Sequence, residues 1–180
     1  MGIADPTRPG SRRRRLAWIV GAVVLAAGVF TAGYGLANQR HGERAAGDQA
    51  AMTARAAQVM PFDLNATRHT FTKTDRGGVQ QVLADDPADR RNIELIRAHL
   101  QQEAAAFRKG DYSDPAKIHG MDMPGVKELE AGASRVQVRY EPLPARARIA
   151  YASSDPVLVA ALHAWFDRQD TDHAMPGMGG

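Results

Sequence analysis

The sequence predicts a two-layer α+β domain, with a four-stranded antiparallel sheet and two helices on one face, preceded by an N-terminal transmembrane helix. Three observations lead to this prediction. An uncharged run of 22 residues lies near the N-terminus, at 16–37. Beyond it, strand-like and helix-like stretches follow in the order β-β-α-β-β-α. Asp-Pro, which commonly starts a helix, stands before both helical stretches, at Asp86-Pro87 and Asp155-Pro156.

The uncharged run, Leu16 to Ala37, is long enough to cross a bilayer. As a helix it spans roughly 33 Å, which matches the hydrocarbon core. Arg12 to Arg15 directly precede it. Because basic flanks stay in the cytoplasm, we expect the following domain on the opposite side of the membrane. Small residues at Gly35 and Ala37 leave one alternative open, which is a signal peptide cleaved after Ala37.

Composition limits the class of protein further. Beyond Ala37 the chain has 18 Lys and Arg against 19 Asp and Glu, so we expect no surface for nucleic acid. The chain has no cysteine, which excludes disulfides, thiolate metal sites and thiol nucleophiles.

We expect five segments along the chain. These are a basic cytoplasmic tail (1–15), the transmembrane helix (16–37), a linker (38–60), the extracytoplasmic α+β domain (61–172) and a flexible tail (173–180). The linker is rich in Ala, Gln, Arg and Gly, so we expect it to be at most partly helical and to add nothing to a hydrophobic core.

The first half of the domain predicts a hairpin and a helix. Residues 67–74 and 79–84 are strand-prone, and Asp-Arg-Gly-Gly between them suits a turn. Apolar residues then recur at spacings of three and four from Ile93 to Phe107, which predicts a helix over about 88–109 with Asp86 as its N-cap.

The second half repeats this order after a long connection. Residues 110–134 form the connection, with one short predicted helix near 126–131. Residues 135–141 and 147–151 alternate apolar and polar side chains on either side of a proline-containing turn, which predicts a second hairpin. A broad apolar stripe over 158–169 predicts the second helix.

The long connection carries the side chains that point most directly to chemistry. His119, Met121 and Met123 alternate along it, and His173 and Met175 combine the same groups in the tail. Thioether and imidazole ligands suit Cu(I) better than hard cations. Outside the cytoplasm they also serve where a free thiol would oxidise. The alternative is that both loop methionines pack the connection onto the sheet.

Two further histidines could complete such a site. His69 shares a predicted strand face with Phe71. His163 lies at the edge of the apolar stripe of the second helix, with Asp167 at the i+4 position as a candidate partner. A half-buried histidine in such a place is more often a hydrogen-bonded packing residue than a ligand, so both readings stay open.

No strong catalytic motif is present. A Gly-x-Ser-x-Gly elbow, a P-loop and His-Glu-x-x-His are all absent from the sequence, so catalytic residues stay unknown. Asp85 and Asp86 are interpreted as a turn and a helix cap rather than an acid–base pair. His99 and Glu103, four residues apart, are interpreted as an exposed pair on the first helix.

Several segments taken together resemble a family of small exported bacterial proteins, over roughly residues 50–173. The segments are Met60-Pro61-Phe62-Asp63-Leu64, His69, Gly77-Gly78-Val79-Gln80, Ile96-Arg97-Ala98-His99-Leu100, Ile118-His119-Gly120, Met123-Pro124-Gly125 and His163-Ala164-Trp165-Phe166-Asp167. Members often carry the label aspartate carbamoyltransferase. The chain lacks the Ser-Thr-Arg-Thr phosphate motif of that enzyme. The resemblance implies an exported protein. It assigns no role to any residue.

These observations favour a single-pass module of the bacterial inner membrane whose extracytoplasmic domain binds copper. The predicted ligands are His119, Met121 and Met123, with His69 or His163 completing the site. Two alternatives stay open, namely a metal-free module that contacts another envelope protein and an enzyme of unknown type. The lipid bilayer is the expected partner of residues 16–37, and no cofactor other than copper is expected.

Overall fold

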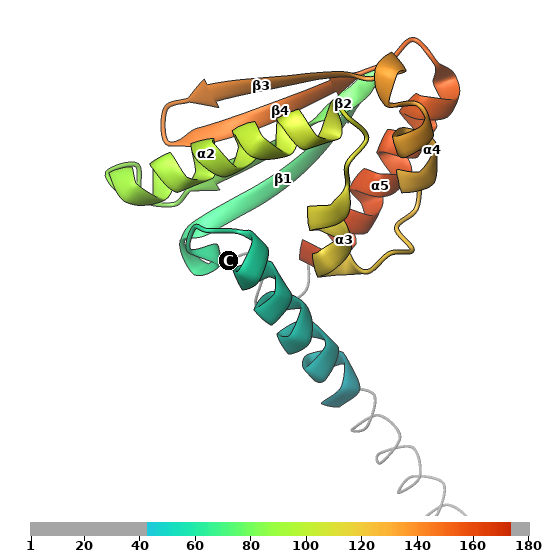
Figure 1. The fold of residues 1–180 in the computed structure, drawn as a ribbon. Helices are drawn as coiled ribbons and strands as arrows, with labels where there is room; N and C mark the ends of the chain where they lie inside the picture. Colours follow the sequence, from blue (N-terminus) through green and yellow to red (C-terminus); the bar gives the residue numbers. More distant parts are fainter. Residues whose placement is uncertain (1–42, 174–180) are drawn as a thin grey trace, which may run out of the picture. The chain divides into compact units, whose positions relative to one another are not determined.

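The computed structural model describes residues 43–173, with side chains described as far as Thr171. Residues 43–59 are helical. The elements that follow are η1 (Leu64–Ala66), β1 (Thr67–Thr74), β2 (Gly77–Ala84), α2 (Arg90–Phe107), α3 (Ser113–His119), α4 (Val126–Ala131), η2 (Ala133–Arg135), β3 (Gln137–Leu143), β4 (Arg146–Ala152) and α5 (Pro156–His173) (Figure 1). All of these named elements belong to one compact unit, which begins at Asp48.

The strands form one antiparallel sheet. Their order is β1-β2-β4-β3, so two hairpins are joined through their inner strands. The register places His69 opposite Val82, and Gln80 opposite Ile149. The predicted α+β class and the four-stranded antiparallel sheet are therefore confirmed.

The helices α2 and α5 pack against the same face of this sheet. Gly78 on β2 and Tyr151 on β4 are register partners, so they share a face. A Cβ added to Gly78 would lie 2.5 Å from the ring of Phe166 on α5. The ring centroids of Tyr151 and Phe107, which ends α2, are 6.1 Å apart. Figure 1 shows α2 lying across the sheet and α4 beside α5.

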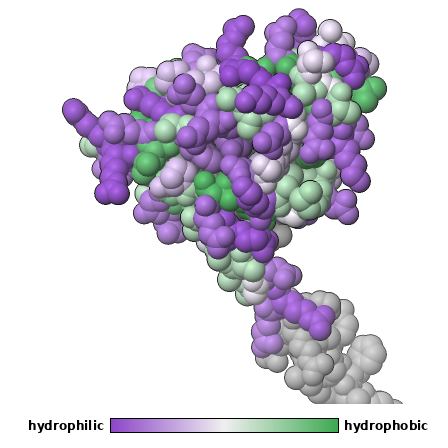
Figure 2. Space-filling view, in the orientation of Figure 1, coloured by the Kyte–Doolittle hydropathy of each residue, from purple (hydrophilic) through white to green (hydrophobic). Residues whose placement is uncertain are grey.

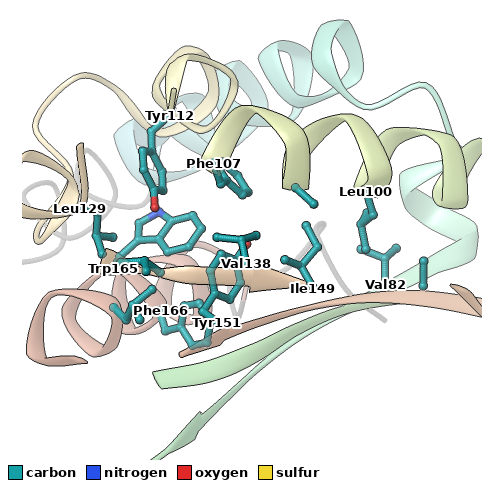
Figure 3. Close-up of a cluster of buried hydrophobic side chains, with 14 of the residues drawn as sticks. Val82, Leu100, Phe107, Tyr112, Leu129, Val138, Ile149, Tyr151, Trp165 and Phe166 are labelled. Carbon is teal, nitrogen blue, oxygen red and sulfur yellow. The ribbon is translucent and has the colours of Figure 1, made fainter. Parts of the chain in front are cut away.

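An aromatic cluster forms the centre of the core (Figure 3). Phe107 and Tyr112 stack with centroids 4.8 Å apart, and the indole of Trp165 meets both rings edge-on. Trp165 is only 1% exposed, so truncating it to Ala should cost about 3–5 kcal/mol. The rest of this core includes Val82, Leu100, Leu129, Val138, Ile149 and Phe166.

The helix α2 begins slightly later than the sequence predicts. Its N-cap is Asp89, whose side chain accepts a hydrogen bond from the backbone N–H of Asn92 at 3.0 Å. Asp86, the predicted cap, instead accepts from the N–H of Ala88 at 2.8 Å and so stabilises the turn before the helix. Both aspartates suit an N-cap, so composition alone did not decide between them.

One helix, α3, was not predicted. The helix α3 lies within the connection, and α4 has the predicted bounds. Residues 48–59 fall in the predicted linker, yet they belong to the compact unit, and Met52 and Ala56 are buried against Ile118 of α3. This contact was not predicted because it is shallow: the methyl group of Ala56 and the thioether side chain of Met52 are enough to form it.

Several predictions fall on residues outside the described range, namely the cytoplasmic tail (1–15), the transmembrane segment (16–37) and the C-terminal tail from 174. Within residues 43–173, no helix combines the length and apolar character needed to span a bilayer. The face seen in Figure 2 is largely hydrophilic, with separated hydrophobic patches.

Candidate functional site

A small cavity lies where β1, β2, α2, α3 and α5 meet the C-terminal end of the helix that ends at residue 59. Its volume is about 30 Å³, which is enough to hold a water molecule. Its polar lining consists of His69, Gln80, His99, Glu103, Asp114, His119 and Gln169. These side chains come from five separate elements, so only the fold brings them together.

Three imidazoles reach the cavity for different local reasons. His69 lies on the inner face of β1, the face that it shares with Phe71. His99 lies on α2 and is only 8% exposed. His119 is the last residue of α3 and precedes Gly120, whose φ of 90° turns the chain away from the helix. The ring of Phe62 lies between the first two, with centroids 5.7 Å from His69 and 5.6 Å from His99.

A pair of carboxyl groups lies beside these imidazoles. Burial raises the pKa of Glu103 to about 8, and the negative charge of Asp114 and a hydrogen bond with it act in the same direction. Glu103 is therefore protonated at neutral pH. The ammonium group of Lys117 lies 2.6 Å from Asp114 and compensates the charge of that second carboxylate. Burial lowers the pKa of His99, which keeps this ring neutral.

The interpretation of His99 and Glu103 as an exposed pair was wrong. Both are buried, at 8% and 6% exposure, and both line the cavity. They directly precede Leu100 and Ala104 of the apolar stripe, so they widen its buried face. The helical spacing was therefore recognised correctly, but the width of the buried face was underestimated.

The three predicted ligands of the connection lie at three different depths. His119 is half-buried and lines the cavity. Met123 is 5% exposed, and its Sδ accepts a hydrogen bond from Nε2 of Gln169 at 3.8 Å. Met121 is 83% exposed. The structure thus brings His69 and His119 to one cavity, with Met123 one side chain away, and leaves Met121 in solvent.

His163 lies elsewhere, at the turn of the first hairpin. Its Nε2 is 3.0 Å from the carbonyl oxygen of Thr74 and 2.9 Å from that of Gly77. Both neighbours are acceptors, so this nitrogen carries a proton and donates. Asp167, the candidate partner of His163, instead pairs with Lys73. We name this arrangement of His163 with the turn the hairpin clamp.

A second hollow, of about 480 Å³, lies beside the hairpin clamp and includes His163, Asp75 and Ser153 in its lining. Ser153 donates to the carbonyl oxygen of Arg135 at 2.9 Å and accepts from the N–H of Asp155 at 3.1 Å. These two hydrogen bonds give Ser153 a structural role at the start of α5.

Among the described residues, no three His, Asp or Glu side chains lie together in the geometry of a metal site. The imidazoles of His69 and His119 line the same cavity, and the thioether of Met123 accepts a hydrogen bond from Gln169, which also lines it. Such a mixed set suits copper, which accepts both imidazole and thioether ligands.

Sequence reasoning missed Asp114 and Gln169 as lining residues. Asp114 lies in α3, which was not predicted, although Ser113-Asp114-Pro115 resembles a helix start. Gln169 stands near the end of α5 and is only 4% exposed. A buried glutamine at the end of an otherwise apolar stripe is the one feature that could have drawn attention to it.

In comparisons with protein-family models, curated proteins and solved structures, none matches this chain. The described residues form a two-layer α+β domain with a histidine-lined cavity between its sheet and helices.

Proposed function

We propose that this chain is a single-pass, membrane-anchored module whose extracytoplasmic domain binds copper. The observation that carries the proposal is the meeting of His69 and His119 at one cavity, although they lie 50 positions apart in the sequence. Met123 contacts Gln169, which lines the same cavity, and so supplies a thioether at short range. The proposed resident ligands are these two imidazoles and this thioether.

The location is proposed from the sequence. The uncharged run at 16–37 behind four arginines favours an anchor whose N-terminus is cytoplasmic. The domain would then work in the periplasm, and the bilayer would be its partner through residues 16–37. The absence of cysteine fits a compartment in which thiols oxidise.

Cu(I) fits this donor set better than other ions do. It is a soft ion that is stable at low coordination number, so two imidazoles and one thioether suffice, whereas Ca²⁺ and Mg²⁺ need more oxygen ligands. The sulfur of Met123 must leave its weak hydrogen bond with Gln169, and a contact of 3.8 Å to sulfur costs little to break.

A copper titration of the full chain in detergent micelles tests the proposal. We expect binding tighter than roughly micromolar, that is a free energy beyond about −8 kcal/mol. His69→Ala and His119→Ala should each weaken it at least about tenfold. Met121→Ala should leave the affinity unchanged, because the exposed thioether lies outside the cavity.

Two results would remove the proposal. One is a full chain that binds Cu(I) no better than a micelle without protein. The other is an affinity that depends on Met121 but not on His69, because the copper would then sit in the exposed loop rather than in the cavity.

An enzyme of unknown type is the second candidate, and Glu103 is the observation that favours it. A carboxylic acid that keeps its proton at neutral pH can donate that proton to a bound molecule. Carbon-13 NMR of the labelled Glu103 carboxyl tests this candidate. A midpoint near 8 supports it, and an ordinary midpoint near 4.5 rejects it.

A further inference from the structure

The loop between α3 and α4 holds one methionine out in solvent. Among the described large hydrophobic side chains, only Met121 and Val157 are exposed, at 83% and 61%. A solvated methionine gains nothing from the packing that normally buries this residue type. What Met121 does offer in water is an accessible thioether.

The position of Met121 is fixed by buried contacts on both sides of it. Before the loop, Ile118 is 2% exposed; after Met121, Met123 is 5% exposed. At Gly125, which has φ of 80°, an added Cβ would lie 2.1 Å from the carbonyl oxygen of Ala161 on α5, so the loop end is pressed against that helix. The loop is therefore anchored, and the exposure of Met121 is a property of the fold.

Met121 also lies close to the proposed copper ligands along the chain. It is two residues from His119, which lines the cavity, and two from the buried Met123. Two residues span at most about 7 Å between Cα atoms. An ion held by the exposed sulfur is therefore within reach of the ligands that flank the cavity.

We propose that Met121 is the capture ligand for incoming Cu(I), which then passes to His119 and the cavity. The inference rests on the proposed copper function. Each step is a ligand exchange at constant oxidation state. A bond from copper to the Met121 sulfur forms as the carrier ligand leaves, and a bond to the His119 imidazole then replaces it.

A capture ligand has a kinetic signature that a resident ligand lacks. It lowers the barrier to association, but it is absent from the final site and so contributes nothing to the equilibrium affinity. Deleting its sulfur therefore slows loading and leaves the dissociation constant unchanged. A resident ligand such as His119 changes the dissociation constant instead.

Stopped-flow loading of the full chain in micelles tests this inference. The probe is Cu(I) kept in solution by acetonitrile, a weak ligand, with oxygen excluded. Met121→Leu keeps the size and apolar character of the side chain and removes only the sulfur. We expect association about tenfold slower, equivalent to about 1.4 kcal/mol of barrier, with the titrated affinity unchanged. Val157→Ala, at the other exposed apolar residue, serves as the matched control and should load at the wild-type rate.

The outcomes separate this inference from the copper function itself. If the wild-type chain binds no Cu(I), the proposed function fails. If the wild-type chain binds and Met121→Leu loads equally fast, the capture role is overturned while the copper site stands. If Met121→Leu weakens the equilibrium affinity, Met121 is a resident ligand, and the capture role is likewise overturned.

Discussion

At the hairpin clamp, Nε2 of His163 lies within 3.0 Å of two backbone carbonyl oxygens, whereas at the cavity His69, His99 and His119 surround a small space beside a carboxyl pair. His163 and His119 are both half-buried. Their surroundings nevertheless differ in kind. The degree of burial therefore does not separate a structural histidine from a candidate ligand, whereas the neighbouring atoms do.

Among the predicted substitutions, one at Gly77 in the hairpin clamp should lower the stability of the fold most. At Gly77, with φ of 149°, an added Cβ would lie 2.2 Å from the carbonyl oxygen of Tyr151. Because backbone cannot move aside cheaply, Gly77→Ala should cost at least about 4 kcal/mol or prevent folding. Thermal unfolding followed by circular dichroism measures this. Gly47→Ala, where nothing lies within 4 Å of the added Cβ, is the control and should not destabilise. Equal melting temperatures for both variants would contradict the prediction.

The carboxyl pair of Glu103 and Asp114 should make the stability of the folded chain depend on pH. The pKa of Glu103 is raised from 4.5 to about 8 in the folded chain. Between these values the folded state binds more protons than the unfolded state, so its contribution to stability is complete below about pH 4.5 and is lost as pH rises through 8.

Glu103→Gln should remove that loss because an amide does not titrate. The difference between the wild-type and variant free energies of unfolding should change by on the order of 2–4 kcal/mol from pH 5 to pH 9. Urea unfolding at a series of pH values measures it. A pH profile that is parallel in the two proteins would show that Glu103 titrates normally.

Replacing His163 and His119 by alanine, one at a time, tests the comparison directly. His163→Ala removes the donor to two carbonyl oxygens and should cost about 1–2 kcal/mol of stability. It should leave the copper affinity intact. His119→Ala should do the reverse, with a small change in unfolding and a large loss of copper binding. Measuring both quantities on both variants is decisive, since copper binding that depends on His163 would place the site at the clamp.

The regular elements could be predicted from the sequence because their information is local. The strand β1, the short helix α4 and most of α2 follow from alternation, from spacing and from capping residues. The strand order β1-β2-β4-β3 joins the two hairpins through long-range pairing, which no local pattern contains. The class of fold was accordingly predictable, and its exact topology was not.

The cavity was only partly predictable for the same reason. His69 and His119 were recognised as chemically suitable, but nothing in their sequence positions indicates that β1 meets α3 there. His99 and Glu103 were assigned to the surface because the helical stripe was drawn too narrow. Which histidines share a site is a property of packing, and it appears only once the helices are placed on the sheet.

The contact between residues 48–59 and α3 has a practical consequence for producing this protein. Arg55 donates from Nε to the carbonyl oxygen of Ile118 at 3.0 Å, and Val59 and Met60 form part of the cavity wall. A recombinant fragment trimmed to start at Pro61 would expose Ile118 and leave one side of the cavity open. Truncated versions made for crystallisation or spectroscopy should therefore begin upstream of Asp48, or their metal measurements will describe a damaged pocket.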